Sequence, residues 1–297
     1  MDLRRNLHYR EETGMLPPDY HTHNAMCHHA EGKLEDYARS AIKKGLAGIG
    51  FNDHFPQWYM PPGPPYDTYS MSRADFPEYF RTARQLQETL KLQIPIKIGT
   101  EVDYTPGKPD CKDSLKPELA RWQFDFVYGS VHVVTLGGET WTVDDEVFLH
   151  KWDQGHNDAV FEEYWRSVQT AIKSGLFDII GHLDLPKKFA KRPEHPEKLT
   201  ALVDEAIELL AKRKVATEIN TSGWYKPVEE QYPSFEILKK IAHAGVGIVI
   251  GSDAHKPELV GRDFPRALGI LKEAGFDELC EFSKRKCVRV PLSKYEK

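Results

Sequence analysis

VGIVIGSDAH, residues 246–255, joins a short run of β-branched side chains to a polar end. A run of this length and composition is typical of a strand that is buried on both faces of a parallel sheet. Gly245 precedes it, and a glycine between an apolar helix and a strand is a common helix C-cap. Asp253 and His255 follow the run, and both side chains can bind a metal ion. This segment therefore predicts a helix–strand unit that carries polar chemistry at the end of its strand.

The same unit recurs along the chain. Short apolar runs, each followed by polar residues that can bind a metal ion, occupy residues 48–51, 94–99, 124–128, 177–180, 215–219 and 246–250, and Asp19–His23 opens the set. Amphipathic stretches such as 34–42 and 199–210 lie between the runs and indicate helices. About seven such units indicate a barrel of parallel strands ringed by helices, with its active site at the C-terminal ends of the strands. The alternative is an open doubly wound sheet, in which ligands from nearly every strand would converge less easily on one point.

Composition excludes several classes of protein. The chain has 297 residues, a formal charge of -5 and scattered Lys and Arg residues, so we expect no nucleic acid partner. No segment approaches the roughly 20 apolar residues of a membrane-spanning helix, so we expect no membrane partner. The four cysteines form no CxxC pair, which favours a reducing, cytoplasmic location. No linker divides the chain, and we expect a single domain over residues 1–297. The oligomeric state is unknown at this level.

Histidines and acids gather at the predicted strand ends. His21 and His23 stand at positions i and i+2 of one strand, so both imidazoles point to the same side. Seven histidines and two acids occupy such positions: His21, His23, His29, His54, Glu101, His132, His182, Asp253 and His255. Each has an ordinary alternative, because a lone histidine can be structural, Glu101 can pair with a lysine, and Asp253 can cap a helix. The whole set is much harder to explain in that way.

Nine candidate ligands exceed the three or four that one zinc ion takes. They suit two or three divalent ions that share a bridging carboxylate. Sites rich in imidazole accept Zn, Mn or Fe, whereas Mg prefers oxygen ligands. Two ions about 3.5–4 Å apart generate hydroxide at neutral pH and hold the oxygens of a phosphoryl group. The pattern therefore predicts a metal-dependent phosphoesterase that acts on a small-molecule phosphate ester.

These motifs resemble the polymerase-and-histidinol-phosphatase (PHP) family of metal-dependent phosphoesterases along nearly the whole chain. The motifs that match are His21-Thr22-His23 with His29, Asp53-His54, Glu101, Ser130-Val131-His132, Gly181-His182-Leu183-Asp184 and Gly251-Ser252-Asp253-Ala254-His255. Three further stretches are similar to the histidinol-phosphate phosphatase branch: residues 27–30, 218–223 and 232–234. Trp224-Tyr225 before Lys226 departs from the pattern of that branch, and the departure concerns the substrate contacts.

The resemblance implies a distorted (β/α)7 TIM-like barrel with a trinuclear metal site. The ligand sets that it implies are His21, His23, Glu101 and Asp253 for the first ion, Glu101, His132 and His182 for the second, and His29, His54 and His255 for the third. The implied reaction is hydrolysis of L-histidinol phosphate to L-histidinol and phosphate, a step of histidine biosynthesis, by a metal-bridging hydroxide. Asp253 and His255 are the catalytic candidates, because either side chain could protonate the leaving oxygen.

Substrate contacts are predicted from residue type and position. The basic residues that could reach the phosphate are Arg166, Lys187, Lys188, Lys226 and Arg262, although each could equally be a solvated surface charge. The imidazole and ammonium groups of the substrate require aromatic faces and carboxylates. The candidates are Trp58, Tyr59 and Tyr66 in the long loop 57–70, together with Asp53, Asp103 and Asp184. A second long loop, 136–157, is expected to overhang the same site.

Two other functions are compatible with the motifs. Another phosphomonoesterase of the same family would act on nucleotides or sugar phosphates. A non-enzymatic metal-binding module belongs to a different class, and the complete set of nine ligands argues against it.

Overall fold

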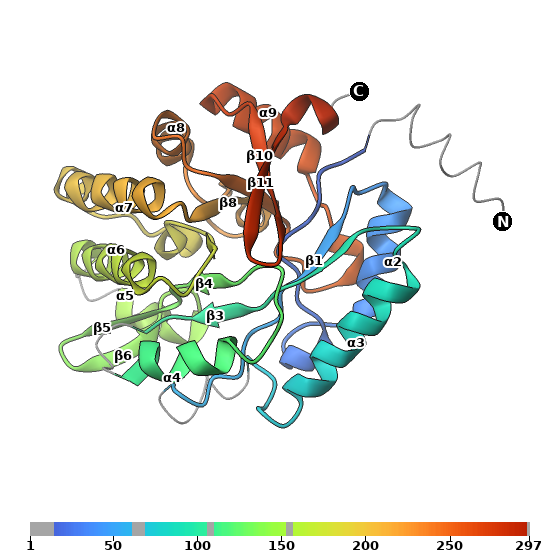
Figure 1. The fold of residues 1–297 in the computed structure, drawn as a ribbon. Helices are drawn as coiled ribbons and strands as arrows, with labels where there is room; N and C mark the ends of the chain where they lie inside the picture. The colour runs from blue at the N-terminus through green and yellow to red at the C-terminus, as the bar shows by residue number, and fades with distance from the viewer. Residues whose placement is uncertain (1–14, 61–68, 106–109, 153–156, 296–297) are drawn as a thin grey trace.

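The computed structural model describes residues 15–60, 69–105, 110–152 and 157–295. It has an α/β fold with a mostly parallel central sheet (Figure 1). Five parallel strands form the larger sheet in the order β3-β4-β7-β8-β9, and β1 and β2 form a separate parallel pair. Their bounds are β1 Ile49–Phe51, β2 Ile96–Ile98, β3 Glu101–Asp103, β4 Tyr128–Ser130, β7 Ile179–Ile180, β8 Ala216–Asn220 and β9 Ile248–Gly251. Each apolar run predicted after residue 48 contains one of these strands or leads into it.

One predicted strand is divided between the two sheets. Ile98 at the end of β2 pairs with Phe51 of β1, whereas Glu101 at the start of β3 pairs with Tyr128 of β4. Gly99 lies at the change of partner, and a side chain would not fit there, because a Cβ atom would lie 2.4 Å from Cζ of Phe126. Glu101 therefore begins a short strand of its own.

The segment Asp19–His23 differs from the prediction, since it forms no named strand. It makes two isolated parallel bridges, from Asp19 to Ile49 and from Thr22 to Ala254. Pro17-Pro18 precede it and have no backbone N–H, so they interrupt the pairing between Asp19 and a further parallel bridge from Leu16 to Leu46. The seven parallel strands form two separate sheets, and the closed barrel stays a prediction.

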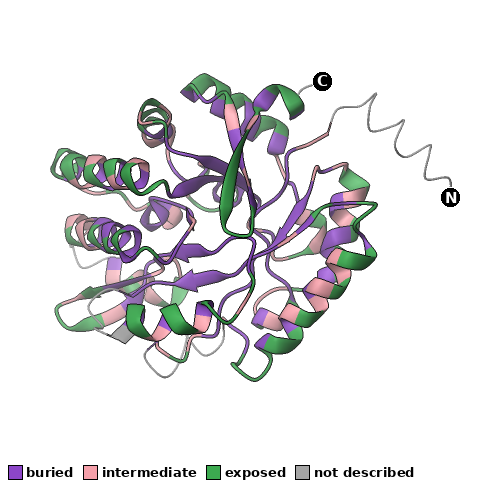
Figure 2. Cartoon of the chain, in the orientation of Figure 1, coloured by how far each residue is buried: buried purple, intermediate pink, exposed green. Residues whose placement is uncertain are grey.

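Helices surround the strands (Figure 1). Their bounds are α2 Leu34–Lys44, α3 Phe76–Thr89, α4 Asp110–Leu119, α5 Leu149–Trp152, α6 Asn157–Ser174, α7 Thr200–Arg213, α8 Phe235–His243 and α9 Phe264–Ala274. The parallel strands are buried except for the half-buried Lys97, whereas most helices combine buried and exposed residues (Figure 2). The amphipathic stretches predicted near residues 34 and 199 are confirmed as α2 and α7, and Gly45 ends α2 with φ 73°, as the C-cap signal predicts.

Two antiparallel hairpins were not expected from the sequence. The first joins β5 (Val133–Leu136) to β6 (Glu139–Thr142), so part of the predicted loop 136–157 is a strand. The second joins β10 (Glu278–Ser283) to β11 (Lys286–Pro291). Lys284 and Arg285 form its turn with φ 49° and 64°. Such turns usually carry Asn or Gly, so the usual sequence signal for a tight hairpin is missing here.

The β10–β11 hairpin packs against the strand ends that lie opposite the predicted site. It completes an apolar cluster of Tyr20, Phe126, Tyr128, Ile179, Ala216, Val249, Cys280 and Phe282. The backbone N–H of Phe282 donates a hydrogen bond to the hydroxyl oxygen of Tyr20 at 2.8 Å. Among the described residues, no helix combines the length and the apolar character needed to span a lipid bilayer.

Candidate metal centre

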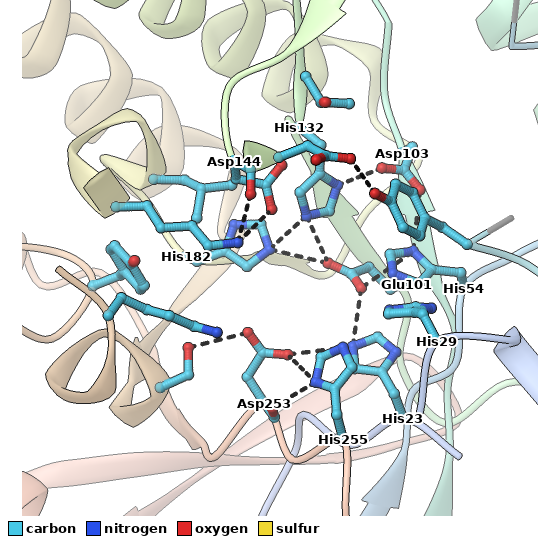
Figure 3. A pocket seen from close by; sticks show the side chains of 18 of the residues that line it. His23, His29, His54, Glu101, Asp103, His132, Asp144, His182, Asp253 and His255 are labelled. Atoms are coloured by element: carbon cyan, nitrogen blue, oxygen red, sulfur yellow. Dashed lines mark hydrogen bonds and ion pairs between the residues drawn. The ribbon is translucent and has the colours of Figure 1, made fainter. Parts of the chain in front are cut away.

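A cavity of ≈ 740 Å³ opens where the parallel strands end. Eight of the nine predicted ligands line it, and the ninth, His21, lies fully buried behind His23. Figure 3 shows the side chains pointing toward one another from different elements of the fold. Glu101 begins β3, His132 follows β4, His182 follows β7, and Asp253 follows β9. The sheet therefore brings together residues that are far apart in the sequence.

The first predicted ligand set is closely grouped. Nε2 of His21 and Nε2 of His23 are 3.1 Å apart. Oε2 of Glu101 lies 3.5 Å from the first nitrogen and 3.3 Å from the second. Oδ1 of Asp253 lies 3.7 and 3.4 Å from the same two atoms. Two ligands at 2.0–2.1 Å from one tetrahedral zinc ion lie about 3.3–3.4 Å apart, so these donor atoms fit one ion.

The second set meets the other oxygen of the same carboxylate. Oε1 of Glu101 lies 3.1 Å from Nε2 of His182 and 3.8 Å from Nε2 of His132. The two histidine nitrogens are 3.1 Å apart. Glu101 thus presents one oxygen to each group, which is the geometry of a bridging carboxylate.

The third set is more open. The ring centroid of His29 lies 4.8 Å from that of His255 and 5.2 Å from that of His54. Donor atoms of His23, His29 and His255 lie within 4.8 Å of one another. Donor atoms of His23, His54 and Glu101 form a second group of the same kind. The three histidines share one region of the cavity without forming a group as tight as the other two.

Hydrogen bonds orient the imidazoles so that Nε2 is left for a ligand. Five of the seven histidines have a protein oxygen near Nδ1: Glu218 at His21, the Cys27 carbonyl at His29, Asp103 at His54 and His132, and the Asp253 carbonyl at His255. A carbonyl oxygen only accepts a hydrogen bond, so Nδ1 of His29 and His255 carries the proton. This is the arrangement that a metal-binding histidine requires.

Burial and mutual contact shift the pKa values of the cluster. Burial opposes charge on Glu101, but the His54 and His21 imidazoles hold its pKa well below the usual range. Burial lowers the pKa of His29 to about 3, which keeps this ring neutral and able to bind a cation. Burial also opposes charge on His132, but Asp103 raises the pKa of that ring to about 10. Buried imidazoles and ionised carboxylates with converging donor atoms fit divalent transition metal ions.

Three of the five basic residues predicted to reach the phosphate line the cavity: Lys188, Lys226 and Arg262. The Arg262 guanidinium stacks on the Tyr225 ring at 3.6 Å from the centroid. Burial and the neighbouring Lys188 lower the pKa of Lys226. No other described residue forms an ion pair with the Lys226 ammonium group, which is consistent with a role toward a ligand.

The other two, Arg166 and Lys187, do not line the cavity, so its geometry does not support their prediction as substrate contacts. Arg166 is exposed on α6, 3.8 Å from Glu162. Lys187 is 2% exposed and donates to Glu230 at 3.0 Å and to the Gln231 carbonyl at 2.7 Å. The neighbouring Lys188 lines the cavity instead. Consecutive residues of a 3-10 helix point about 120° apart, so only one of two adjacent lysines can face the site.

For three polar residues of the site, the sequence did not predict the contacts that the structure shows. Asp103, Glu218 and Asp144 contact ligand histidines or a cavity lysine. Asp103 stands two residues after Glu101 on one strand, so the period of two places both on the same side. That signal was in the sequence. Asp144 follows the β5–β6 hairpin, whose position could not be predicted.

Of the three aromatic residues predicted to contact the substrate, two lie in the part of the chain that the structure describes. Tyr59 is partly buried, and its hydroxyl group donates to the Asp103 carbonyl at 2.8 Å. Trp58 is 38% exposed and stacks under the Arg73 guanidinium at 4.3 Å. Tyr66 lies outside the described residues. Of the other predicted acids, Asp53 accepts from Asn24 at 2.8 Å and Asp184 pairs with Lys187 at 3.1 Å, and neither lines the cavity.

Comparison with known proteins agrees with this geometry. A protein of Deinococcus radiodurans named probable histidinol-phosphatase is 35% identical over 259 residues, covering 86% of this chain and 93% of that protein. The histidinol-phosphatase of Bacillus subtilis is 29% identical, covering 83% of this chain and 96% of that protein. The crystal structure of histidinol phosphate phosphatase from Lactococcus lactis, complexed with zinc, L-histidinol and phosphate, matches with a TM-score of 0.75 and 28% identity, covering 91% and 98% of the two chains.

The family match spans most of the site. The model of the PHP domain matches residues 19–222, which include seven of the nine predicted ligands and all the strands from β1 to β8. The two remaining ligands, Asp253 and His255, lie beyond the match and close the first and third groups in space. The chain therefore belongs to the PHP domain family.

Proposed function

We propose that this protein hydrolyses L-histidinol phosphate to L-histidinol and phosphate, a step of histidine biosynthesis. The observation that carries the proposal is Glu101, whose two oxygens face two separate groups of histidines inside one cavity. The Lactococcus lactis protein with zinc, L-histidinol and phosphate supports the choice of substrate, because the two chains match over nearly their whole length.

The metal ligands follow from the groups described above. His21, His23, Glu101 and Asp253 would hold one ion, Glu101, His132 and His182 a second, and His29, His54 and His255 a third. Zinc, manganese and iron all suit these donors. When bound, such ions lower the pKa of water and neutralise charge on a phosphoryl group.

The basic residues at the cavity would bind the phosphate. Lys188, Lys226 and Arg262 retain the role predicted from the sequence, whereas Lys187 and Arg166 do not line the cavity. Lys188 donates to the Asp144 carbonyl at 2.6 Å and lies 3.2 Å from the carboxylate of the same residue. This contact holds its ammonium group at the cavity wall.

Acidic residues that line the cavity would meet the cationic part of the substrate. Asp144, Asp145 and Glu146 all line the cavity. Asp145 accepts hydrogen bonds from Tyr69 and from the Val147 backbone, whereas the exposed Glu146 side chain has no hydrogen bond or ion pair with the described residues. Glu146 is therefore the best placed of the three for the ammonium group of L-histidinol phosphate.

Proton transfer to the leaving oxygen falls to one of two predicted residues. Burial opposes charge on Asp253, but the His21 and His23 imidazoles hold its pKa well below the usual range, which makes it a poor acid. His255 is 35% exposed at its side chain and faces the cavity. His255 is the better placed of the two, but its Nδ1–H donates to the Asp253 carbonyl at 2.9 Å, so it can protonate the leaving oxygen only while its Nε2 carries a proton and is not bound to an ion.

A closed (β/α)7 barrel in a single domain remains part of the proposal. Segment 19–23 lies between the first and last strands, since Gly50 donates to the Asp19 carbonyl at 2.7 Å and Tyr20 donates to the Ile250 carbonyl at 3.0 Å. Between the ends of the two sheets, the backbone N–H of Phe55, which follows β1, donates to the carbonyl of Glu101 at the start of β3 at 2.7 Å. These hydrogen bonds support a continuous ring of seven segments.

Steady-state kinetics with a panel of phosphomonoesters tests the function. L-Histidinol phosphate should have the highest kcat/KM, ahead of nucleotide and sugar phosphates. Glu146→Gln should lower that preference, while Glu139→Gln should not, since Glu139 is an exposed acid paired with Lys151 outside this cavity. A nucleotide or sugar phosphate turned over tenfold more efficiently than L-histidinol phosphate would assign the protein to another phosphomonoesterase activity of the family.

A further inference from the structure

Asp103 occupies an unusual position between two of the ligand groups. It ends β3, two residues after Glu101, and is 3% exposed. Oδ1 contacts Nδ1 of His132, and Oδ2 lies 3.1 Å from Nδ1 of His54. Figure 3 shows this carboxylate at the edge of the cluster with both contacts drawn. One side chain thus touches two histidines that belong to different metal groups.

Other contacts fix the carboxylate in place. Gln57 donates to Oδ2, and the Tyr59 hydroxyl group donates to the Asp103 backbone carbonyl at 2.8 Å. Burial opposes charge on Asp103, but the His132 and His54 rings hold its pKa well below the usual range. Both oxygens are already used by protein donors, so a role in binding the cationic part of the substrate is disfavoured.

We propose that Asp103 is a positioning residue that fixes the imidazoles of His54 and His132 at once and thereby couples the second and third metal sites. The proposal rests on the ligand assignment in the proposed function. Each oxygen accepts the Nδ1–H of one ring, which leaves both Nε2 atoms for metal. When an ion orders one of these rings, it also orders the carboxylate that holds the other ring.

Replacement by asparagine separates this role from simple packing. Asn has nearly the same shape but one acceptor oxygen and one NH2 donor. It can accept the Nδ1–H of one histidine, while its NH2 group faces the Nδ1–H of the other. Asp103→Asn should therefore disrupt one ring and leave the other held.

Zinc titration of the metal-free protein tests the proposal without reference to activity. Wild type should bind two or three equivalents. Asp103→Asn should keep the first ion and bind at least one other about 10- to 100-fold more weakly, the range seen when an outer partner of a ligand histidine is lost. Asp103→Glu retains two acceptors and should bind more zinc than Asp103→Asn.

Asp125→Asn is the matched control. Asp125 is a buried carboxylate at the apolar end, and it accepts from the Ile98 and Lys284 backbones at 3.0 and 3.1 Å. Its replacement should lower the free energy of unfolding without changing zinc stoichiometry. Wild-type zinc binding in Asp103→Asn, or equal weakening of every site, would overturn the proposal.

A second measurement needs no variant. Long-range 1H–15N correlation spectra of the zinc-loaded wild type should show slowly exchanging Nδ1 protons on both His54 and His132. Fast exchange on either ring would overturn the proposal even if Asp103→Asn fails to fold. Fewer than two zinc equivalents in the wild type would instead remove the metal assignment on which the proposed function rests.

Discussion

The two ends of the parallel strands are chemically opposite. At one end, imidazoles and carboxylates converge on a cavity. At the other, Tyr20, Phe126 and Tyr128 pack edge to face, with ring centroids 5.1 and 5.8 Å apart, under the β10–β11 hairpin. Aromatic packing at that end stabilises the fold. The contrast teaches that metal chemistry and packing stability occupy separate ends of the same strands.

Replacing Glu101 should have the largest effect. Glu101→Ala removes the carboxylate shared by two histidine groups, so more than one equivalent of metal should be lost by elemental analysis. Phosphatase activity should fall by well over about 100-fold, beyond the range for residues that only orient a ligand. A variant with its full metal load would show that Glu101 does not bridge.

Phe126→Ala makes the corresponding change at the apolar end. The ring is fully buried and packs on Gly99 and Tyr20, so its loss should cost about 3–5 kcal/mol of unfolding free energy. Urea denaturation measures this cost. The protein that remains folded should keep the metal content and kcat of wild type. Loss of metal under native conditions would mean that the two ends are not separable.

Glu218→Gln probes the connection between the ends. Glu218 contacts Nδ1 of His21 at 3.1 Å and accepts from the Tyr128 hydroxyl group at 3.2 Å, so it joins a ligand to the aromatic cluster. Loss of one acceptor should weaken zinc binding at the first site by about 10- to 100-fold in a chelator competition assay. Tyr128→Phe removes only the hydroxyl hydrogen bond to Glu218, keeps the ring in the aromatic cluster, and should leave zinc affinity within about threefold. Equal effects of both variants would assign the role to the hydrogen bond between Tyr128 and Glu218.

The smallest expected effect concerns the charge of Lys226. Burial and Lys188 lower its pKa from 10.5, so its ammonium group loses the proton at a lower pH than an ordinary lysine. Inhibition by inorganic phosphate should therefore weaken, by about tenfold, as the pH rises toward 10.5. Lys226→Arg keeps its charge and should not show this weakening. A parallel pH dependence in both proteins would exclude Lys226 as a phosphate contact.

The sequence predicted most of the metal centre because its residues share one kind of position. Most candidate ligands lie at the end or the start of a short strand segment, and parallel strands bring such positions to one edge, whereas His29 lies in the loop before α2. Eight of the nine line the cavity. The structure places the donor atoms where an ion would need them.

The substrate contacts were less predictable because they depend on local side-chain direction. Lys187 and Lys188 are adjacent in sequence, yet one is buried against Glu230 and the other lines the cavity. The β5–β6 hairpin brings Asp144 to the cavity, and a strand pairing of this kind depends on contacts distant in sequence. The β10–β11 turn lacks the usual glycine or asparagine, so the element that closes the apolar end left no clear signal.

The spread of the ligands along the chain has a consequence for biosynthesis. A ribosome releases His21 and His23 early, but Asp253 and His255 follow more than two hundred residues later. The first and third sites therefore remain incomplete while most of the polypeptide is still being translated. We expect metal loading to be a late event that follows chain release, so a cell depleted of zinc or manganese should accumulate full-length apoprotein in place of stalled, partly metallated fragments.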